Sequence, residues 1–185
     1  MGRLACVPQW FQEVGWRLSF VQITICKLRA RDLEILRNLS RLKCLILGLD
    51  FILREAIVIG IQGFKELQRF SVDCPVPWLT FFSGEMQKPT YLRLDFRACP
   101  TGPICIPSGI SNLRSLTEVS LYYNMRYANS SSVKMTVKVV RKEVAMLRRR
   151  RMSEMISNLK YIWLNNTHIL SNLKYSICTF IIIQQ

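Results

Sequence analysis

The sequence has little of what catalytic and metal sites are built from. Its 185 residues include one histidine, His168, and only 12 acidic residues against 26 Lys and Arg. A hydrolytic triad or a zinc centre needs more such side chains placed close together. No G-x-x-x-x-G-K-[ST] motif for phosphate binding occurs. We therefore expect no enzyme activity, no metal and no cofactor, and we expect His168 to be an ordinary polar residue on a loop.

Long apolar runs and paired cysteines are missing as well. No segment of the sequence approaches the roughly 20 apolar residues of a transmembrane helix, and residues 1–16 contain no apolar core of a secretory signal. The seven cysteines are scattered, odd in number and without a C-x-x-C pair, which indicates neither a disulfide framework nor a zinc site. We expect reduced cysteines packed as small core residues in a cytoplasmic protein.

What the sequence does contain is enough apolar residues for one domain with a sizeable core, since half of the chain is hydrophobic. Residues 106–124 show how these residues are arranged. Ile106, Ile110, Leu113 and Leu116 recur at threes and fours, which is typical of a helical or winding face. The phrase Leu116-x-x-Val119-x-Leu121 then shortens to the period of a strand.

The same phrase, leucine-x-x-leucine-x-leucine, recurs along the chain. Copies start at residues 18, 42, 67, 89 and 116, so they are 24, 25, 22 and 27 residues apart, and Pro89 stands where leucine is usual. This is the roughly 20–29 residue period of leucine-rich repeats. The spacing predicts an α/β repeat fold: a leucine-rich-repeat solenoid with a short parallel concave sheet, an irregular or helical convex side and a C-terminal helix. A sixth copy starts at Leu159.

These patterns divide the chain into four segments. We expect about five repeats in residues 1–125, with the first one partial, and a linker over 126–132. A basic amphipathic helix follows over 133–152, and a divergent tail over 153–185 could hold one more repeat. On the convex side, Asp32 is the expected N-cap of a short helix, and residues 73–89 are expected to form an irregular packed loop. Because nothing at Met1 resembles a cap, we expect the chain to begin partway through a longer solenoid.

In such strands the x positions face the concave surface, which is the usual binding surface. Aligning the five phrases gives three rows, which contain a mixed charged and aromatic patch. Its members are Arg69, Tyr91, Arg93, Asp95, Glu118 and Tyr122. Arg and Tyr are favoured interface anchors, so we expect a protein-binding face here, with an ordinary polar surface as the alternative. Glu118 and Tyr122 are expected at one edge of it, beside the closing helix.

The expected helix over 133–152 has an apolar side, with Val133, Val137, Val140, Val144 and Leu147 at threes and fours. It also carries a basic patch, formed by Lys138, Arg141, Lys142, Arg148, Arg149, Arg150 and Arg151. The net charge of +14 suits acidic partners or simple solubility. The basic patch suits nucleic acid, an anionic membrane or a nuclear localisation signal. We favour the simpler interpretation, the solvated end of a helix whose cations suit the helix dipole, because no aromatic residues interleave for base stacking.

Three further segments carry a family resemblance when they are taken in order. They are GFKELQRFSV (63–72), LTFFSGEMQKPTYLRLDF (79–96) and GISNLRSLTEVSL (109–121). This order resembles the last repeats of plant, and particularly grass, nucleotide-binding leucine-rich-repeat disease resistance proteins of the coiled-coil class. Residues 86–90 depart from the family phrase, with the proline displaced. The resemblance covers about residues 7–147 and leaves 152–185 unexplained.

The resemblance implies a non-catalytic protein-interaction module of an innate immune receptor. Its partners would be a pathogen effector, a guarded host protein or the receptor's own nucleotide-binding domain, which the repeats would hold inactive. That switch is missing from this sequence, which implies a truncated receptor. The resemblance gives no reason to expect a small-molecule substrate, and nucleic acid or membrane is not the expected partner. Two alternatives stay open: a basic helix that binds nucleic acid or an anionic membrane, and a remnant without function.

Overall fold

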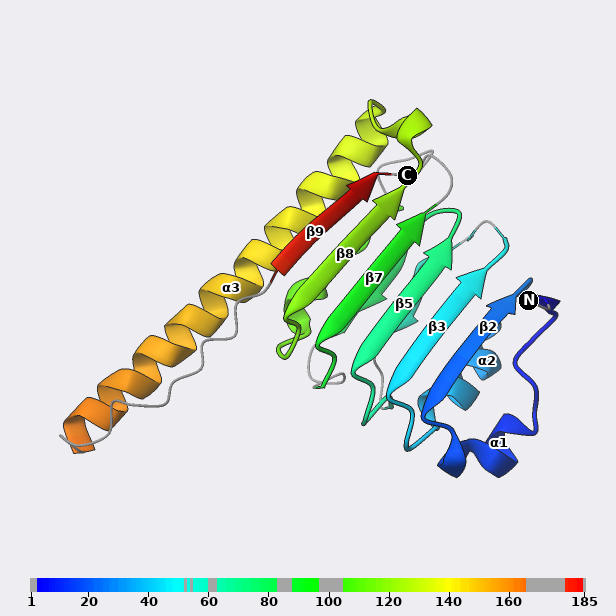
Figure 1. Ribbon diagram of the computed structural model, residues 1–185, viewed down its shortest axis with the longest axis horizontal. Helices are drawn as coiled ribbons and strands as arrows, with labels where there is room; N and C mark the ends of the chain where they lie inside the picture. Colours follow the sequence, from blue (N-terminus) through cyan, green and yellow to red (C-terminus); the bar gives the residue numbers. More distant parts are fainter. Residues whose placement is uncertain are drawn as a thin grey trace.

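The computed structural model describes residues 3–51, 53, 55–59, 63–82, 88–96, 105–165 and 179–184, with the backbone alone for residues 125, 154–165 and 179–184. Its largest feature is a seven-stranded parallel sheet (Figure 1). In sheet order the strands are β1 (Arg3–Leu4), β2 (Phe20–Ile25), β3 (Cys44–Leu49), β5 (Arg69–Cys74), β7 (Tyr91–Phe96), β8 (Glu118–Tyr123) and β9 (Thr179–Gln184). The predicted parallel sheet is therefore present, and neighbouring strands follow one another along the chain.

The repeated phrase is what sets the register of this sheet. Its second and third apolar residues alternate along each strand and are buried, as Leu45 and Leu47 of β3 and Leu92 and Leu94 of β7 show. Its first residue lies just before the strand: Leu42, Leu67 and Leu116 have no exposed surface, and Leu18 packs against the same core while partly buried. Three inward side chains from each repeat thus bury apolar surface in one continuous core.

Pro89 occupies the leucine position of its repeat and is buried there. In the other repeats the backbone N–H of that leucine donates to a carbonyl three residues earlier, as Leu67 does to Phe64. Proline lacks this N–H, so the substitution removes a turn bond. The bonds between repeats are kept, because the Gln68 carbonyl accepts from the N–H groups of Thr90 and Tyr91, as the Lys43 carbonyl accepts from Gln68 and Arg69.

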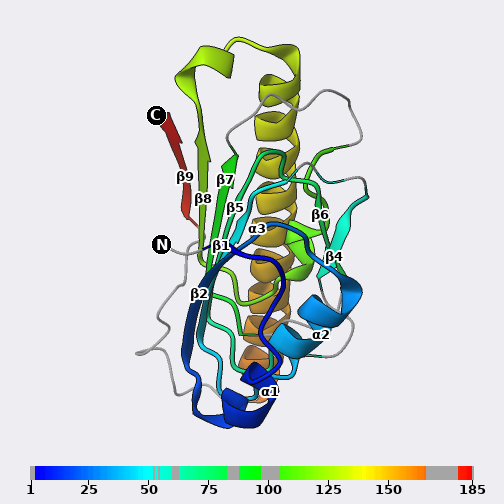
Figure 2. The same ribbon diagram turned by 90° about the vertical axis from the view of Figure 1, so that its right-hand side faces the viewer.

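A second layer covers one face of the sheet (Figure 2). It contains the helix α2 (Ala30–Arg37), the short strands β4 (Ile57–Ile59) and β6 (Leu79–Phe81), and the 3-10 turn η2 (Ile110–Asn112). The short helix α1 (Phe11–Val14) and the turn η1 (Gly15–Arg17) precede β2. β4 and β6 pair in parallel, and an isolated bridge from Thr80 to Ser108 continues this pairing. The expectation of an irregular loop over 73–89 was therefore wrong for residues 79–81, which form β6, and for residues 73–74, which end β5. Residues 83–87 lie outside the described part of the chain.

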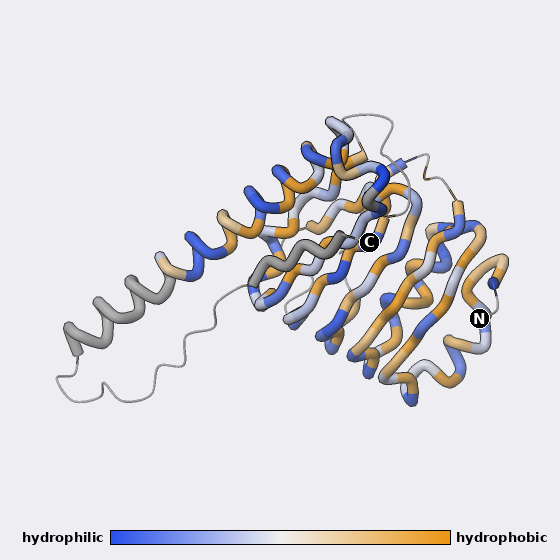
Figure 3. Tube along the Cα trace, turned by 45° about the horizontal axis from the view of Figure 1, so that its top comes forward, coloured by the Kyte–Doolittle hydropathy of each residue, from blue (hydrophilic) through white to orange (hydrophobic). Residues whose placement is uncertain are grey.

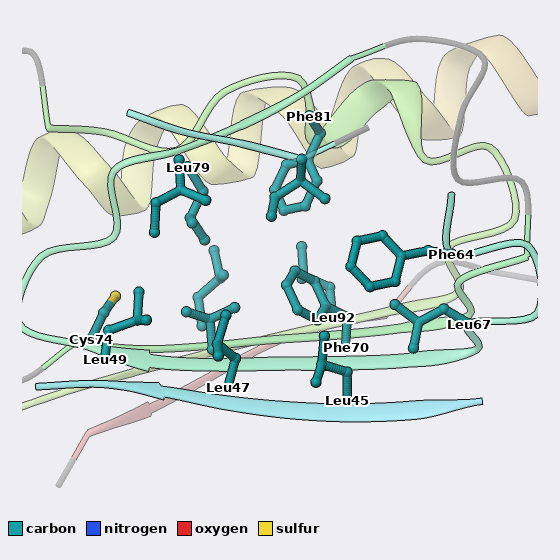
Figure 4. Close-up of a cluster of buried hydrophobic side chains, with 14 of the residues drawn as sticks. Leu45, Leu47, Leu49, Phe64, Leu67, Phe70, Cys74, Leu79, Phe81 and Leu92 are labelled. Carbon is teal, nitrogen blue, oxygen red and sulfur yellow. The ribbon is translucent and has the colours of Figure 1, made fainter. Parts of the chain in front are cut away.

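The core lies between the sheet and the second layer. Figure 4 shows Leu79 and Phe81 pointing from the second layer towards Leu47 and Phe70 of the sheet. The rings of Phe70 and Phe81 meet edge to face at 6.4 Å, within the usual range for favourable aromatic pairs. Phe64 completes the group, with its ring 6.3 Å from that of Phe70.

Asp32 stabilises the start of α2, but not from the expected position. The N-cap is Arg29, and Asp32 is the third residue of the helix. Its buried carboxylate reaches back and accepts a hydrogen bond from the Arg29 N–H at 2.8 Å. It also accepts one from the Val7 N–H at 2.9 Å. Asp32 therefore satisfies one free donor at the helix start and ties the segment before α1 to the second layer.

The C-terminal helix α3 (Ser131–Asn165) has 35 residues and follows the turn η3 (Met125–Tyr127). Val133, Val140, Val144 and Leu147 are buried, and Val137 packs against the core at its margin. The apolar side predicted for this helix is thus the side that packs. Within the described part of the chain, no helix has an apolar stretch long enough to cross a membrane.

The boundaries of this region differ from the expected ones. The helix begins at Ser131, inside the expected linker, and continues to Asn165, so the phrase that starts at Leu159 lies in a helix and the strand expected there was wrong. The reason is that residues 131–165 contain neither Pro nor Gly, so nothing ends the helix early. Residues 166–178 lie outside the described part. β9 then pairs in parallel with β8, so β8 is not the edge strand.

Candidate functional site

The face of the sheet opposite the second layer carries the candidate site. We call it the open sheet face: the outward side chains of β2, β3, β5, β7 and β8. Figure 2 shows α2, β4, β6 and α3 on the other side of the sheet. In Figure 3, hydrophobic and hydrophilic residues alternate along the strands, as expected when one side faces a core and the other solvent.

The strand pairing aligns the outward side chains in the three rows expected from the sequence. The rows are Phe20–Cys44–Arg69–Tyr91–Glu118, Gln22–Ile46–Ser71–Arg93–Ser120 and Thr24–Gly48–Asp73–Asp95–Tyr122. All six residues of the predicted patch therefore lie together on β5, β7 and β8. Arg69 is exposed, and the other five side chains are half-buried.

Within this patch both arginines are held against aromatic rings. The guanidinium of Arg69 lies 4.5 Å from the ring centre of Tyr91, the residue opposite it on the next strand. The guanidinium of Arg93 lies 3.9 Å from the ring centre of Tyr122, and its Nη2 donates to Asp95 Oδ2 at 2.9 Å. Cation–π contacts and a charged hydrogen bond fix the direction in which each planar group points.

The electrostatics of Arg93 follow from this setting. Burial alone would lower the pKa of its guanidinium, but the hydrogen bond and the negative charge of Asp95 outweigh burial and raise that pKa. The side chain therefore stays a cation. At the next strand, the Ser120 hydroxyl donates to Glu118 Oε1 at 3.3 Å. The patch thus presents donors, carboxylates and ring faces in defined positions, which is the chemistry of protein recognition.

The described part of the chain shows no clustered metal ligands. Those residues contain no group of three or more His, Cys, Asp or Glu that could hold a metal ion. His168 lies outside them. Of the described cysteines, all are free thiols, but only Cys74 is buried, and Cys26 is exposed. The core role expected for the cysteines therefore holds for Cys74, while Cys44 lies on the open sheet face.

The basic patch lies on α3, away from the open sheet face. Lys138, Arg141, Lys142, Arg148, Arg149 and Arg150 are exposed, and Arg151 is half-buried. The Arg148–Arg151 run was expected at a solvated helix end, but the helix continues past it to Asn165. Two of these arginines also bind carbonyls near η2: Arg150 Nη1 donates to Ser111 O at 3.4 Å and Arg151 Nε donates to Arg114 O at 2.9 Å. The run therefore does not lie at a helix end. Arg148, Arg149 and Arg150 are exposed as expected, and only Arg151 of the run is half-buried.

Glu143, about two turns before Arg150, docks the same helix against the same turn. Its carboxylate accepts hydrogen bonds from the N–H of Ser111 at 3.0 Å and from the N–H of Gly109 at 3.4 Å. Gly109 has φ 75°, and a Cβ there would meet the Phe81 carbonyl oxygen at 2.0 Å, so glycine is required. α3 is thus fixed to the turn at η2 by an acceptor and two donors in addition to its valines.

A hollow that the sequence did not reveal lies at the first turns of α3. It has a volume of about 330 Å³ and is lined by Tyr123, Ala128, Val133, Lys134, Val137, Lys138 and Arg141. Of its three cationic residues, Lys134 was not among the predicted ones. The sequence spacing could have indicated that these three cations share a face, because Lys134, Lys138 and Arg141 are four and three residues apart.

Comparison with known proteins places the chain among defined relatives. Residues 1–153 match the family model described as a leucine-rich repeat region. The chain is similar to the disease resistance proteins Pikm1-TS and Piks-1 of rice (Oryza sativa subsp. japonica), with 31% identity over 139 residues, and to Pik-1 of rice, with 30%. Each match covers 74% of this chain and 12% of the relative, so the chain spans about an eighth of the length of these proteins. No solved structure was found to match it.

Proposed function

We propose that this chain, which belongs to the leucine-rich repeat region family, is a non-catalytic protein-interaction module of a plant disease resistance protein. Membership of the family rests on the match over residues 1–153, with the similarity to rice resistance proteins placing the module in plant immunity. Its setting would be the cytoplasm, as the resemblance to intracellular receptors suggests. The chain spans only part of the length of these relatives, so its role within a whole receptor is part of the proposal.

The proposal includes the arrangement of the repeats as a solenoid. The support for this is that successive strands keep one register from β2 to β8. The same two bonds to one carbonyl also recur at each step between repeats. A stack of this kind extends a continuous outward surface across many repeats, which is how such folds bind large partners.

Within this module the patch on β5, β7 and β8 is the proposed contact surface. The observation that carries it is the fixed arginine pair: Arg93 between Tyr122 and Asp95, and Arg69 over Tyr91. Pre-positioned Arg and Tyr side chains lose little conformational entropy on binding, which is why they are common binding anchors. The partner would be a pathogen effector, a guarded host protein or the nucleotide-binding domain of the receptor itself, whose inactive state the contact would favour.

The test is a pull-down with the full chain from extracts of infected and healthy plant tissue. We expect Arg93→Ala and Tyr122→Ala each to lose a specific partner, with affinity reduced about tenfold to thirtyfold if these are anchors. Gln22→Ala and Thr24→Ala are matched controls, because they lie in the same rows on β2, away from the patch. If the patch variants and the controls recover every partner equally, the patch is not the contact surface.

A second arm separates the candidate partners. The nucleotide-binding domain of a plant disease resistance receptor is supplied as a separate chain, and its binding to the parent and to Arg93→Ala is compared. Binding that depends on Arg93 supports an autoinhibitory contact within the receptor. Binding only to proteins from infected tissue supports effector recognition.

A further inference from the structure

The cationic residues of α3 form a stripe that the proposed function does not use. The cationic stripe consists of Lys134, Lys138, Arg141, Lys142, Arg148 and Arg149. At 3.6 residues per turn they fall within an arc of about 120° on the helix, and all six are exposed. The apolar residues that dock the helix, such as Val140 and Leu147, lie outside this arc and are buried.

The part of α3 that carries the stripe has few acidic residues. Residues 131–153 contain one acidic residue, Glu143, and its carboxylate is bound to the N–H groups of Gly109 and Ser111 on the packed side. On an exposed helix, opposite charges one turn apart normally neutralise one another. Here Lys134, Lys138 and Lys142 are like charges one turn apart, an arrangement that is mildly destabilising by itself and that a negatively charged partner relieves.

The hollow at the start of the stripe adds a second feature. Tyr123, Ala128, Val133 and Val137 give it an apolar wall, and Lys134, Lys138 and Arg141 give it a cationic one. A volume of about 330 Å³ is at the lower end of the range for sites that enclose small ligands or large side chains. A ligand that fits both features carries negative charges beside an apolar group.

We propose that this hollow and the cationic stripe bind an acidic protein segment, which places an apolar side chain in the hollow and its carboxylates against Lys134, Lys138 and Arg141. This is a second interaction surface, separate from the patch on the open sheet face. Carboxylates four and three residues apart on a helical segment match the spacing of the three cations.

Two other classes of anionic partner fit the structure less well. An amphipathic helix binds a membrane surface through its apolar side, and the apolar side of α3 is buried in the core. Proteins that bind single-stranded nucleic acid combine cations with exposed aromatic rings for stacking. Among the described residues that line the hollow, Tyr123 is the one aromatic residue, and it is buried.

The experiment uses the full chain and a fluorescein-labelled helical peptide built from Glu and Ala with one Leu, read by fluorescence anisotropy. We expect Lys138→Glu combined with Arg141→Glu to weaken binding about tenfold or more. The matched control is Lys27→Glu combined with Arg31→Glu, which makes the same change of charge at exposed residues near α2 and should bind within about twofold of the parent. Binding should weaken as salt increases.

A second pair of measurements tests the hollow without altering charge. Replacing the Leu of the peptide with Ser should weaken binding to the parent severalfold, and Ala128→Phe, which fills the hollow, should weaken binding of the Leu peptide but not of the Ser peptide. The comparison of the Leu and Ser peptides uses the parent chain alone, so it does not depend on the folding of any variant. Arg93→Ala should bind both peptides like the parent, so this proposal can fail while the open sheet face still binds its partner.

Three outcomes overturn the proposal. One is equal binding by the parent and by the Lys138→Glu, Arg141→Glu variant. Another is an equal loss in the Lys27→Glu, Arg31→Glu control, since general charge would then explain the binding. The third is tighter binding of phosphatidylserine vesicles or duplex DNA than of the peptide at the same salt concentration, with the same loss in the α3 variant.

Discussion

The two ends of the open sheet face share one backbone geometry and differ in their outward side chains. β2 and β3 pair in the same parallel register as β7 and β8. The outward residues of β2 and β3 are neutral and include Phe20, whose ring is exposed, and Gly48, which has no side chain. Those of β5, β7 and β8 include two arginines, two tyrosines and three carboxylates.

This contrast separates what builds the fold from what gives it a binding surface. The inward apolar residues of both ends have the same spacing and are all buried, so they contribute to the core in the same way. The outward residues can differ between the two ends because the register of the strands is set by the inward apolar residues. We therefore expect substitutions of inward residues to act alike at both ends, and substitutions of outward residues to act differently.

The largest effect is expected from the core. Leu47→Ala in β3 and Leu94→Ala in β7 each remove a leucine side chain that is 1% exposed, and each should lower the free energy of unfolding by about 2–5 kcal/mol. Chemical denaturation followed by circular dichroism measures both. A large decrease in the free energy of unfolding for one variant, with almost no decrease for the other, would mean that the two ends are not equivalent parts of one core.

A smaller effect is expected on the outward side. Arg93→Ala removes the ion pair with Asp95 and the contact with the Tyr122 ring, and we expect a loss of about 0.5–2 kcal/mol because the pair is partly exposed. Thr24→Ala, in the row of Tyr122 at the other end of the face, should change stability by less than about 0.5 kcal/mol. Equal losses of stability in the two variants would show that the contacts of Arg93 with Asp95 and Tyr122 do not stabilise the fold.

The smallest effect is expected at the boundary between the two ends, where Cys44 of β3 faces Arg69 of β5. Burial raises the pKa of the Cys44 thiol, and the positive charge of Arg69 partly opposes this. Since the thiolate is the reactive form, Cys44 should be alkylated more slowly than an exposed thiol and should reach its full rate at a higher pH than a thiol with the ordinary pKa. Arg69→Gln removes the opposing charge, so it should raise the pKa further and slow Cys44 again.

Mass spectrometry of the alkylated chain over a pH series measures these rates residue by residue. Cys26 serves as the internal control, because it is exposed and lies at the end of β2, away from Arg69. An unchanged rate at Cys44 in Arg69→Gln would mean that the positive charge of Arg69 does not affect the thiol of Cys44 on the neighbouring strand.

The strands and their outward rows could be predicted because one short phrase determines them. In Leu116-x-x-Val119-x-Leu121 the inward positions must be apolar, so the remaining positions are outward, and the repeat length sets which of them pair. The position of Arg93 beside Tyr122 follows from that alignment. The stacking of its guanidinium on the ring does not follow, because it depends on the chosen side-chain rotamers.

Other parts could not be predicted with the same certainty because their patterns are ambiguous. Leu159-x-x-Ile162-x-Leu164 fits a strand phrase, but its first interval of three also fits a helix face, and α3 continues through it. The strands β4 and β6 have only three residues each, too few for a clear alternation. Asp32 is a good N-cap residue by type, yet the third helical position also favours a carboxylate.

The most direct test of the central claim is a comparison of two cross-linking positions on the open sheet face. A photoreactive phenylalanine is placed at Tyr122 in one chain and at Thr24, in the same row, in another. Each chain is irradiated in plant extract with an excess of unlabelled competitor. We expect a specific adduct from position 122 that unlabelled parent chain suppresses and unlabelled Arg93→Ala does not. Equal adducts from both positions, or equal suppression by both competitors, would contradict the claim that the charged end of this face is the binding surface.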